Sequence, residues 1–205
     1  MTATASASHT AAMLGMGSLA HRPGASERFG ALYETHVDFV WRNARRLGVP
    51  DSAADDVVQS VFLVVFRRLD EFEGRSSLRT WIYEIVVRVV RDYRRTMRRK
   101  SPHATDAEPV DPGTLSAPPE DRPDAQAGRA EAARAVQDLL DGLDDAKREV
   151  FVLVELERLT LNEIAQILHE PAGTIATRLR AARADFAQAA RRRRAQDERR
   201  LRWTG

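Results

Sequence analysis

Six prolines and six acidic residues crowd one segment of this 205-residue chain, residues 101–128. Proline lacks the backbone N–H that continues a helix, and a charged segment of this composition has little apolar surface to bury. We therefore expect a flexible linker with a separately folded part on either side. Its acids either keep the linker solvated or allow it to fold back over a basic surface.

Both flanking parts carry apolar side chains at the i, i+3, i+4 spacing of amphipathic helices. The expected helices run from about Glu27 to the stop at Gly48-Val49-Pro50, from about Asp51 to Leu69, from about Ser77 to Arg99, from about Arg129 onward, over Leu161–Leu168 and over Ala172–Ala189. The pattern predicts an all-α fold, with two small helical domains joined by the linker.

The predicted organisation has five parts. They are a disordered N-terminal tail (1–25), a first helical domain (26–100), the linker (101–128), a second helical domain (129–190) and a basic C-terminal tail (191–205). The absence of cysteine excludes disulfides, cysteine zinc sites and thiol nucleophiles. The apolar runs are far shorter than the roughly 18 residues that span a bilayer, so we expect no membrane insertion.

The segment from Leu159 to Leu179 predicts a helix-turn-helix. Thr160 followed by Glu163 makes a capping box at the start of its first helix. The expected buried positions are Ile164, Ala165, Leu168, Ile175 and Leu179. The outer face of the second helix would then present Thr174, Ala176, Thr177, Arg178, Arg180 and Ala181 to a DNA major groove. An ordinary helical hairpin gives a similar pattern, and nearby Arg183 and 191–194 favour DNA.

The net charge of +2 averages over basic, acidic and basic blocks along the chain. Lysine occurs only at Lys100 and Lys147, so nearly all positive charge is arginine. A coding bias or a need for phosphate contacts would each produce that preference. Basic blocks on two separate domains indicate two contacts with one polyanion.

Aromatic and basic residues alternate around the third expected helix. The Gly/Ser loop at 72–77 precedes Trp81 and Tyr83, and the helix ends in arginines. Rings that stack on bases, combined with arginine charge, suit single-stranded DNA. A flexible loop beside them could hold a base taken out of the stack. Trp81 also fits an ordinary core position.

With these residues in view, the chain resembles the extracytoplasmic-function (ECF) RNA polymerase sigma factors of the sigma-70 family. Three segments carry the resemblance. They are Asp55-Asp56-Val57-Val58-Gln59-Ser60-Val61-Phe62, Ser77–Ile85 with Arg91-Asp92-Tyr93-Arg94-Arg95, and Leu159–Arg183. The resemblance implies a protein without catalysis, cofactor or metal that acts in the cytoplasm at the nucleoid. It implies binding to core RNA polymerase (β′ clamp and β flap), promoter DNA and an anti-sigma factor of unknown identity.

The resemblance also assigns residues. Polymerase binding would fall to Asp55, Asp56 and Gln59. Binding of the −10 DNA would fall to Phe72, Arg75, Ser76, Ser77, Arg79, Trp81, Arg88, Arg91, Arg94, Arg95, Arg98 and Arg99. Binding of the −35 DNA would fall to Thr174, Ala176, Thr177, Arg178, Arg180, Ala181 and Arg183.

Several positions depart from the family pattern. Ser60 stands where an acid is usual, and Arg88 where an asparagine is usual. Ala176 and Thr177 replace a basic residue and a serine, and His169 occupies the usual glycine position between the two helices. The promoter sequence therefore cannot be transferred from the family.

Two other functions fit parts of the sequence. A stand-alone helix-turn-helix regulator explains the second domain but leaves the first without a use, and no dimerisation helix is evident. A metal-dependent helical hydrolase would need Asp55 and Asp56, or Glu34, His36 and Asp38. Adjacent helical residues point in different directions, and no ligand-spaced cluster follows.

Overall fold

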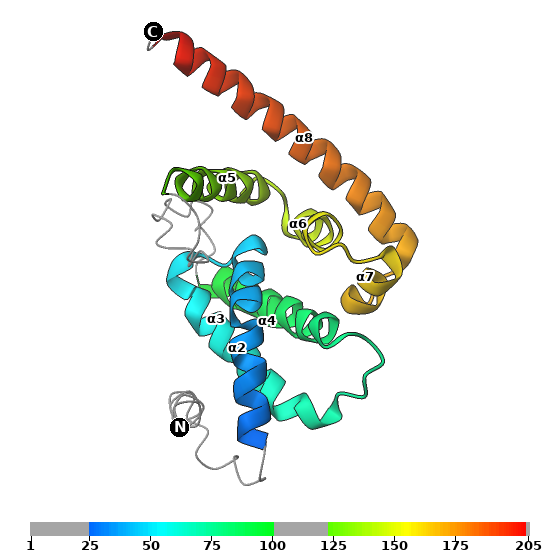
Figure 1. The fold of residues 1–205 in the computed structure, drawn as a ribbon. Coiled ribbons are helices and arrows are strands. Elements are labelled where there is room, and N and C mark those ends of the chain that lie inside the picture. The colour runs from blue at the N-terminus through cyan, green and yellow to red at the C-terminus, as the bar shows by residue number, and fades with distance from the viewer. Residues whose placement is uncertain (1–24, 101–122, 204–205) are drawn as a thin grey trace. The chain divides into compact units, whose positions relative to one another are not determined.

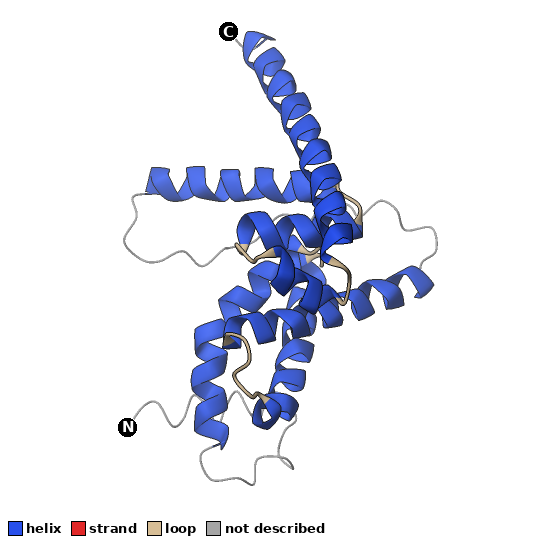
Figure 2. Cartoon of the chain, turned by 90° about the vertical axis from the view of Figure 1, so that its right-hand side faces the viewer, coloured by secondary structure: helices blue, strands red, loops and turns tan. Residues whose placement is uncertain are grey.

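The computed structural model describes residues 25–100 and 123–203, which form helices and short connections without a strand (Figures 1 and 2). The helices build two compact units, one mainly from α2, α3 and α4 and one mainly from α5 to α8. This confirms the all-α prediction with two helical domains. The expected N-terminal tail, apart from its last residue, and most of the expected linker lie outside the described residues.

The first unit contains the three helices that the apolar spacing predicts. They are α2 (Ala25–Arg46), α3 (Asp51–Arg68) and α4 (Leu78–Lys100), with a short 3-10 helix (Leu69–Glu71) after α3. Gly48 turns the chain between α2 and α3 with a φ of 92°, a value that glycine adopts without strain. The Arg45 Nε lies 2.5 Å from an Asp51 carboxylate oxygen across this turn.

Aromatic rings join these helices in the first core. The ring centroid of Phe29 on α2 lies 6.3 Å from that of Phe62 and 5.0 Å from that of Phe66, both in edge contacts. Phe39 of α2 meets Tyr83 of α4 at 5.7 Å. Edge-to-face pairs of this kind add about 0.5–1.5 kcal/mol beyond the area that they bury.

The second unit contains α5 (Pro123–Asp141), α6 (Asp145–Phe151), a π-helical turn (Val152–Leu156), α7 (Leu161–Leu168) and α8 (Ala172–Trp203). Helix α5 begins inside the segment expected as linker, because a proline is compatible with the first turn of a helix. Helix α8 continues through the expected C-terminal tail. Residues 174–203 contain no glycine or proline and are rich in Ala and Arg, both strong helix formers.

Arg148 and two aromatic rings fasten this unit together. The Arg148 guanidinium donates to the carbonyl oxygens of Leu140, Asp141 and Leu143 at 2.9–3.3 Å. These are carbonyls at and just after the end of α5, which have no partner within the helix. Phe151 stacks on Phe186 of α8 with centroids 4.4 Å apart.

Helices α7 and α8 form the predicted helix-turn-helix. The Thr160 hydroxyl accepts from the Glu163 N–H at 3.3 Å, and the Glu163 carboxylate accepts from the Thr160 N–H at 2.8 Å, so the capping box is confirmed. His169 ends α7 with φ 56° and ψ 41°, a left-handed conformation. That conformation explains why glycine is usual at this position. Ile164, Leu168, Ile175 and Leu179 are buried as expected, whereas Ala165 is half-buried.

We expect acid to weaken the start of α7. Hydrogen bonds from the Thr160 N–H, and then from its hydroxyl, lower the pKa of Glu163. A carboxyl whose pKa is lower in the folded than in the unfolded chain stabilises the fold above its unfolded pKa. That stabilisation is lost as the pH falls through the folded pKa. Protection factors at residues 161–165, corrected for the intrinsic pH dependence of exchange, should therefore fall between about pH 5 and pH 3.

The matched control for this prediction is Glu163→Gln, which keeps a hydrogen-bond acceptor at that position but cannot titrate. Its protection factors should start lower and show no step over the same pH range. An equal step in both proteins would contradict a role for the Glu163 carboxyl.

Candidate nucleic-acid interface

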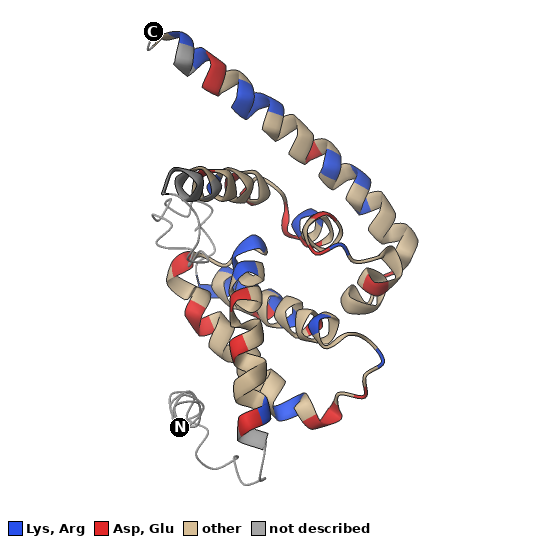
Figure 3. Ribbon diagram, in the orientation of Figure 1, with Lys and Arg blue, Asp and Glu red and all other residues tan. Residues whose placement is uncertain are grey.

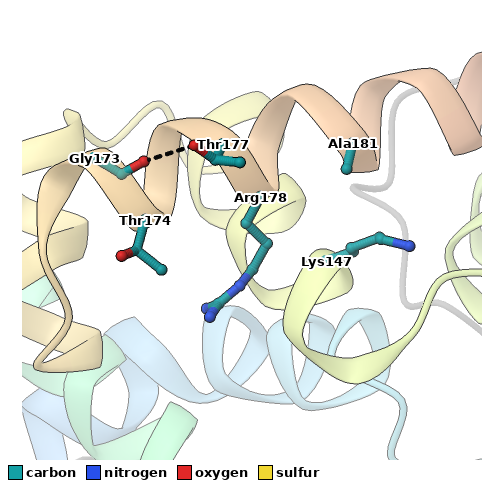
Figure 4. A pocket seen from close by; sticks show the side chains of 6 residues that line it. All are labelled: Lys147, Gly173, Thr174, Thr177, Arg178 and Ala181. Atoms are coloured by element: carbon teal, nitrogen blue, oxygen red, sulfur yellow. Dashed lines mark hydrogen bonds between the residues drawn. The ribbon is translucent and has the colours of Figure 1, made fainter.

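The first turns of α8 present an open face above a shallow depression (Figure 4). Thr174 and Thr177 are exposed, and Ala176 and Ala181 are half-buried. The depression has a volume of about 500 Å³ and is lined by Lys147, Gly173, Thr174, Thr177, Arg178 and Ala181. The small side chains leave room for another molecule to approach the helix closely. Four of the seven residues predicted for −35 binding thus share one surface.

Lys147 also lines this surface, although its sequence context does not predict a place in a DNA-binding site. It lies on α6, 2.8 Å from an Asp185 carboxylate oxygen and 2.9 Å from an Asp144 carboxylate oxygen. Hydrogen bonds to Asp185 and then to Asp144 raise the pKa of Lys147 to about 12. Lys147 therefore stays protonated at neutral pH, and its charge is offset by the two carboxylates beside it. The sequence sets Lys147 apart only by its rarity, because the chain contains just one other lysine.

The three predicted arginines of α8 have different surroundings. Arg178 donates to both Glu170 carboxylate oxygens, at 3.0 and 2.6 Å, and is half-buried. This pair fixes the plane of the guanidinium at the edge of the depression. Arg183 pairs with Glu155 of the π-helical turn at 2.6 Å. Arg180 is exposed and forms no ion pair within the described parts of the chain.

The loop before α4 combines exposed polar residues with a pair of rings. Phe72 and Trp81 are both half-buried, with centroids 5.3 Å apart. Ser77 caps α4, because its Oγ accepts from the Thr80 N–H at 3.0 Å. Ser76 is exposed, and Arg75 is exposed but lies 2.5 Å from Glu73. Each ring is thus mostly packed, with a smaller part open to solvent.

Arg79 lies against α2. Its guanidinium carbon is 4.5 Å from the centre of the Phe39 ring, a cation–π contact. Burial, and then the positive charge of Arg79, lower the pKa of His36, which lies on α2 with Phe39. Arg79 therefore joins two helices as well as contributing charge to the surface.

The arginines in the second half of α4 separate into exposed and buried positions. Arg88, Arg95, Arg98 and Arg99 are exposed, and Arg91 is half-buried. Arg88 lies 3.5 Å from Glu84, and Arg95 lies 2.9 Å from Asp92. Arg94 is only 8% exposed. Its burial places it among packed residues and not on the surface where phosphate contacts were expected.

The residues predicted to bind polymerase share the exposed side of α3. Asp55, Asp56 and Gln59 are all exposed, while Val57 and Val58 between them are buried. The Ser60 hydroxyl donates to the Asp56 carbonyl at 2.9 Å. Burial, and then the charge of Asp56, raise the pKa of Tyr93 on α4.

The described residues contain neither a metal-binding cluster nor a helix suited to cross a membrane. Over residues 25–100 and 123–203, no group of three or more His, Asp or Glu side chains is placed to hold a metal ion. None of the helices in the same ranges combines the length and the apolarity that a bilayer-spanning helix needs.

Comparison with known families places both units in one family. Residues 32–100 match Sigma-70 region 2, and residues 133–186 match Sigma-70 region 4. The ECF RNA polymerase sigma-E factor of Haemophilus influenzae is 34% identical over 132 residues, covering 62% of this chain and 69% of that protein. RNA polymerase sigma factor CnrH of Cupriavidus metallidurans is 33% identical over 165 residues, covering 78% and 85%.

Two solved structures share the helical fold. CnrH in complex with the cytosolic domain of CnrY matches with a TM-score of 0.56 and 26% identity, covering 88% of this chain and 94% of that one. The sigma factor RpoE of Bartonella quintana, solved in complex with the anti-sigma factor NepR, matches with a TM-score of 0.61. It is 19% identical and covers 80% of this chain and 98% of that chain, so it supports the fold alone.

The burial of Arg94 generates a prediction about neighbouring arginines. Arg94→Ala removes packed methylene groups as well as a charge, so it should lower the free energy of unfolding by about 1–3 kcal/mol. Arg95→Ala changes an exposed side chain and should change it by less than about 0.5 kcal/mol. Urea unfolding followed by circular dichroism measures both. Equal stability of the two variants would mean that Arg94 is not packed in solution.

Proposed function

The chain belongs to the extracytoplasmic-function sigma factors of the sigma-70 family, and we propose that its two helical units divide promoter recognition between them. As a member of that family it binds core RNA polymerase and directs promoter recognition and transcription initiation. The open face at the start of α8 is the observation on which the division of labour chiefly depends. The protein itself carries out no chemistry in this proposal, because the polymerase supplies the active site.

The second unit would read the −35 element in duplex DNA. Thr174 and Thr177 would face base edges, with Ala176 and Ala181 allowing close approach. Arg178, oriented by Glu170, and exposed Arg180 would reach bases or phosphates. Arg183, which the sequence predicts to bind DNA, would act as a support for α8, because its ion pair with Glu155 holds this helix against the π-helical turn. A helix that enters the major groove by its first turns needs this kind of support.

The first unit would bind the melted −10 DNA. The exposed parts of Phe72 and Trp81 offer ring surface for a base, and Arg75 and Ser76 lie beside them in the loop. The other arginines in the second half of α4 would contact the phosphates of the strand. They are Arg88, Arg91, Arg95, Arg98 and Arg99. Three of the predicted residues would act through the fold. Ser77 caps α4, Arg79 joins α4 to α2, and Arg94 packs in the core.

Polymerase contacts would come from both units. Asp55, Asp56 and Gln59 form an exposed acidic face on α3 that suits the β′ clamp, and the second unit would dock on the β flap. The protein would then act in the cytoplasm, at the nucleoid. Since similar CnrH is solved with the cytosolic domain of CnrY, we also propose that an anti-sigma factor controls the chain.

Run-off transcription with core RNA polymerase and a promoter library tests the proposed function. We expect transcripts that depend on both the protein and polymerase, from promoters that share −35 and −10 sequences. A stand-alone regulator would instead bind a symmetric duplex site without polymerase and start no transcript. That outcome would overturn the sigma-factor proposal.

The acidic face of α3 generates a second prediction. Asp55→Ala/Asp56→Ala removes two exposed charges, so the fold should remain intact while the affinity for core polymerase falls tenfold or more, as for the loss of contacts worth about 1.4 kcal/mol or more. Glu34→Ala/Asp38→Ala removes the same charge from exposed positions of α2 and should leave that affinity unchanged. Fluorescence anisotropy with core polymerase measures both. Equal losses would show that only net charge matters.

A further inference from the structure

Helix α8 extends well beyond the match to the family. The region 4 match ends at residue 186, whereas α8 continues to Trp203. The additional 17 residues make about 25 Å of helix at 1.5 Å per residue. Residues 191–202 contain seven arginines and two acids, and the DNA-reading role proposed above does not use them.

Four arginines of this extension fall on one side of the helix. At 100° per residue, Arg191, Arg192, Arg199 and Arg202 lie within an arc of about 100°. All four are exposed. Thr174, Thr177 and Ala181 fall within the same arc, so the four arginines continue the line of the proposed −35 surface. We call these four residues the arginine face.

The opposite side of the extension packs within its own unit. Arg193 lies 2.6 Å from an Asp138 carboxylate oxygen of α5, and Ala189 and Ala190 nearby are half-buried. Helix α5 contacts α8. The extension is therefore held by the second unit as far as Arg193, and the residues beyond position 195 whose exposure is described are exposed. Figure 3 shows the bands of positive charge along α8.

The arginine face has no acidic partner among the described residues. No ion pair joins Arg191, Arg192, Arg199 or Arg202 to any carboxylate there. Asp197 lies outside the arc and Glu198 at its edge. Like charges on one helix face repel each other, so a polyanion that binds them would relieve an unfavourable arrangement.

We propose that the arginine face binds the phosphate backbone of duplex DNA next to the −35 element. The face spans about 16 Å along α8. A DNA strand presents one phosphate per 3.4 Å of axis, so several phosphates lie within that length. Guanidinium groups suit phosphate oxygens geometrically. The inference rests on the proposed function, because that function places the start of α8 in the major groove.

Binding of the full-length protein to a labelled 40-base-pair duplex of arbitrary sequence, followed by anisotropy at increasing KCl, tests this surface. Arg191→Gln/Arg192→Gln/Arg199→Gln/Arg202→Gln should bind at least tenfold more weakly at low salt. Its slope of log affinity against log salt should be smaller by about two to four, since each phosphate contact contributes about 0.9. Glutamine keeps helix propensity, and circular dichroism checks that α8 remains folded.

The matched control is Arg28→Gln/Arg42→Gln/Arg67→Gln/Arg134→Gln, which removes the same charge from exposed positions elsewhere. Its slope should change by less than one. Equal slopes for the two quadruple variants would overturn the proposal, as would an unchanged slope in the arginine-face variant. A 40-nucleotide single-stranded RNA that binds more tightly than the duplex through these arginines would also overturn it.

A separate variant keeps this test distinct from that of the proposed function. Thr174→Ala/Thr177→Ala should reduce discrimination between a promoter recovered by run-off transcription and a scrambled duplex, with the salt slope unchanged. If the threonine variant still discriminates between the two duplexes, the −35 assignment of Thr174 and Thr177 is wrong. The arginine face is then tested by the salt slope of its own quadruple variant. If discrimination falls but the arginine-face slope does not change, only the further inference fails.

Discussion

The left-handed turn at His169 determines what the second unit can present to DNA. It stops α7 after Leu168 and allows α8 to begin three residues later, so that Ile175 and Leu179 face the buried side of α7. The capping box at Thr160 fixes the other end of α7. The turn at His169 and the capping box at Thr160 together therefore set the direction in which Thr174 and Thr177 point.

Arginine performs two different tasks in this chain. Arg148 satisfies the carbonyls at the end of α5, Arg183 joins α8 to the π-helical turn, and Arg94 is packed in the first unit. A long side chain with several N–H donors can bridge elements that apolar residues cannot. Arg180 and Arg99, by contrast, are exposed without an ion pair among the described residues. The abundance of arginine therefore reflects structural needs as well as DNA binding.

The periodic spacing of apolar residues made most helices predictable. Where that spacing is weak, the ends of the helices could not be predicted. Apolar spacing located α2, α3, α4, α7 and the start of α8 to within a few residues. It could not locate the start of α5 or the end of α8, because both segments are rich in alanine and charge and carry little apolar pattern. The burial of Arg94 was also hidden, since a charged residue within an arginine-rich helix looks the same in sequence whether its methylenes are packed or solvated. Lys147 joins the proposed −35 surface only through tertiary packing of α6.

The unbroken course of α8 makes its two ends mechanically dependent on each other. No glycine or proline lies between Thr174 and Trp203 to absorb a twist. Inserting one residue near position 187 would rotate everything beyond it by 100°, whereas inserting a full heptad would nearly restore the original phase. An insertion or deletion in α8 therefore keeps its two ends on the same side of the helix only when it changes the length by close to a whole number of turns.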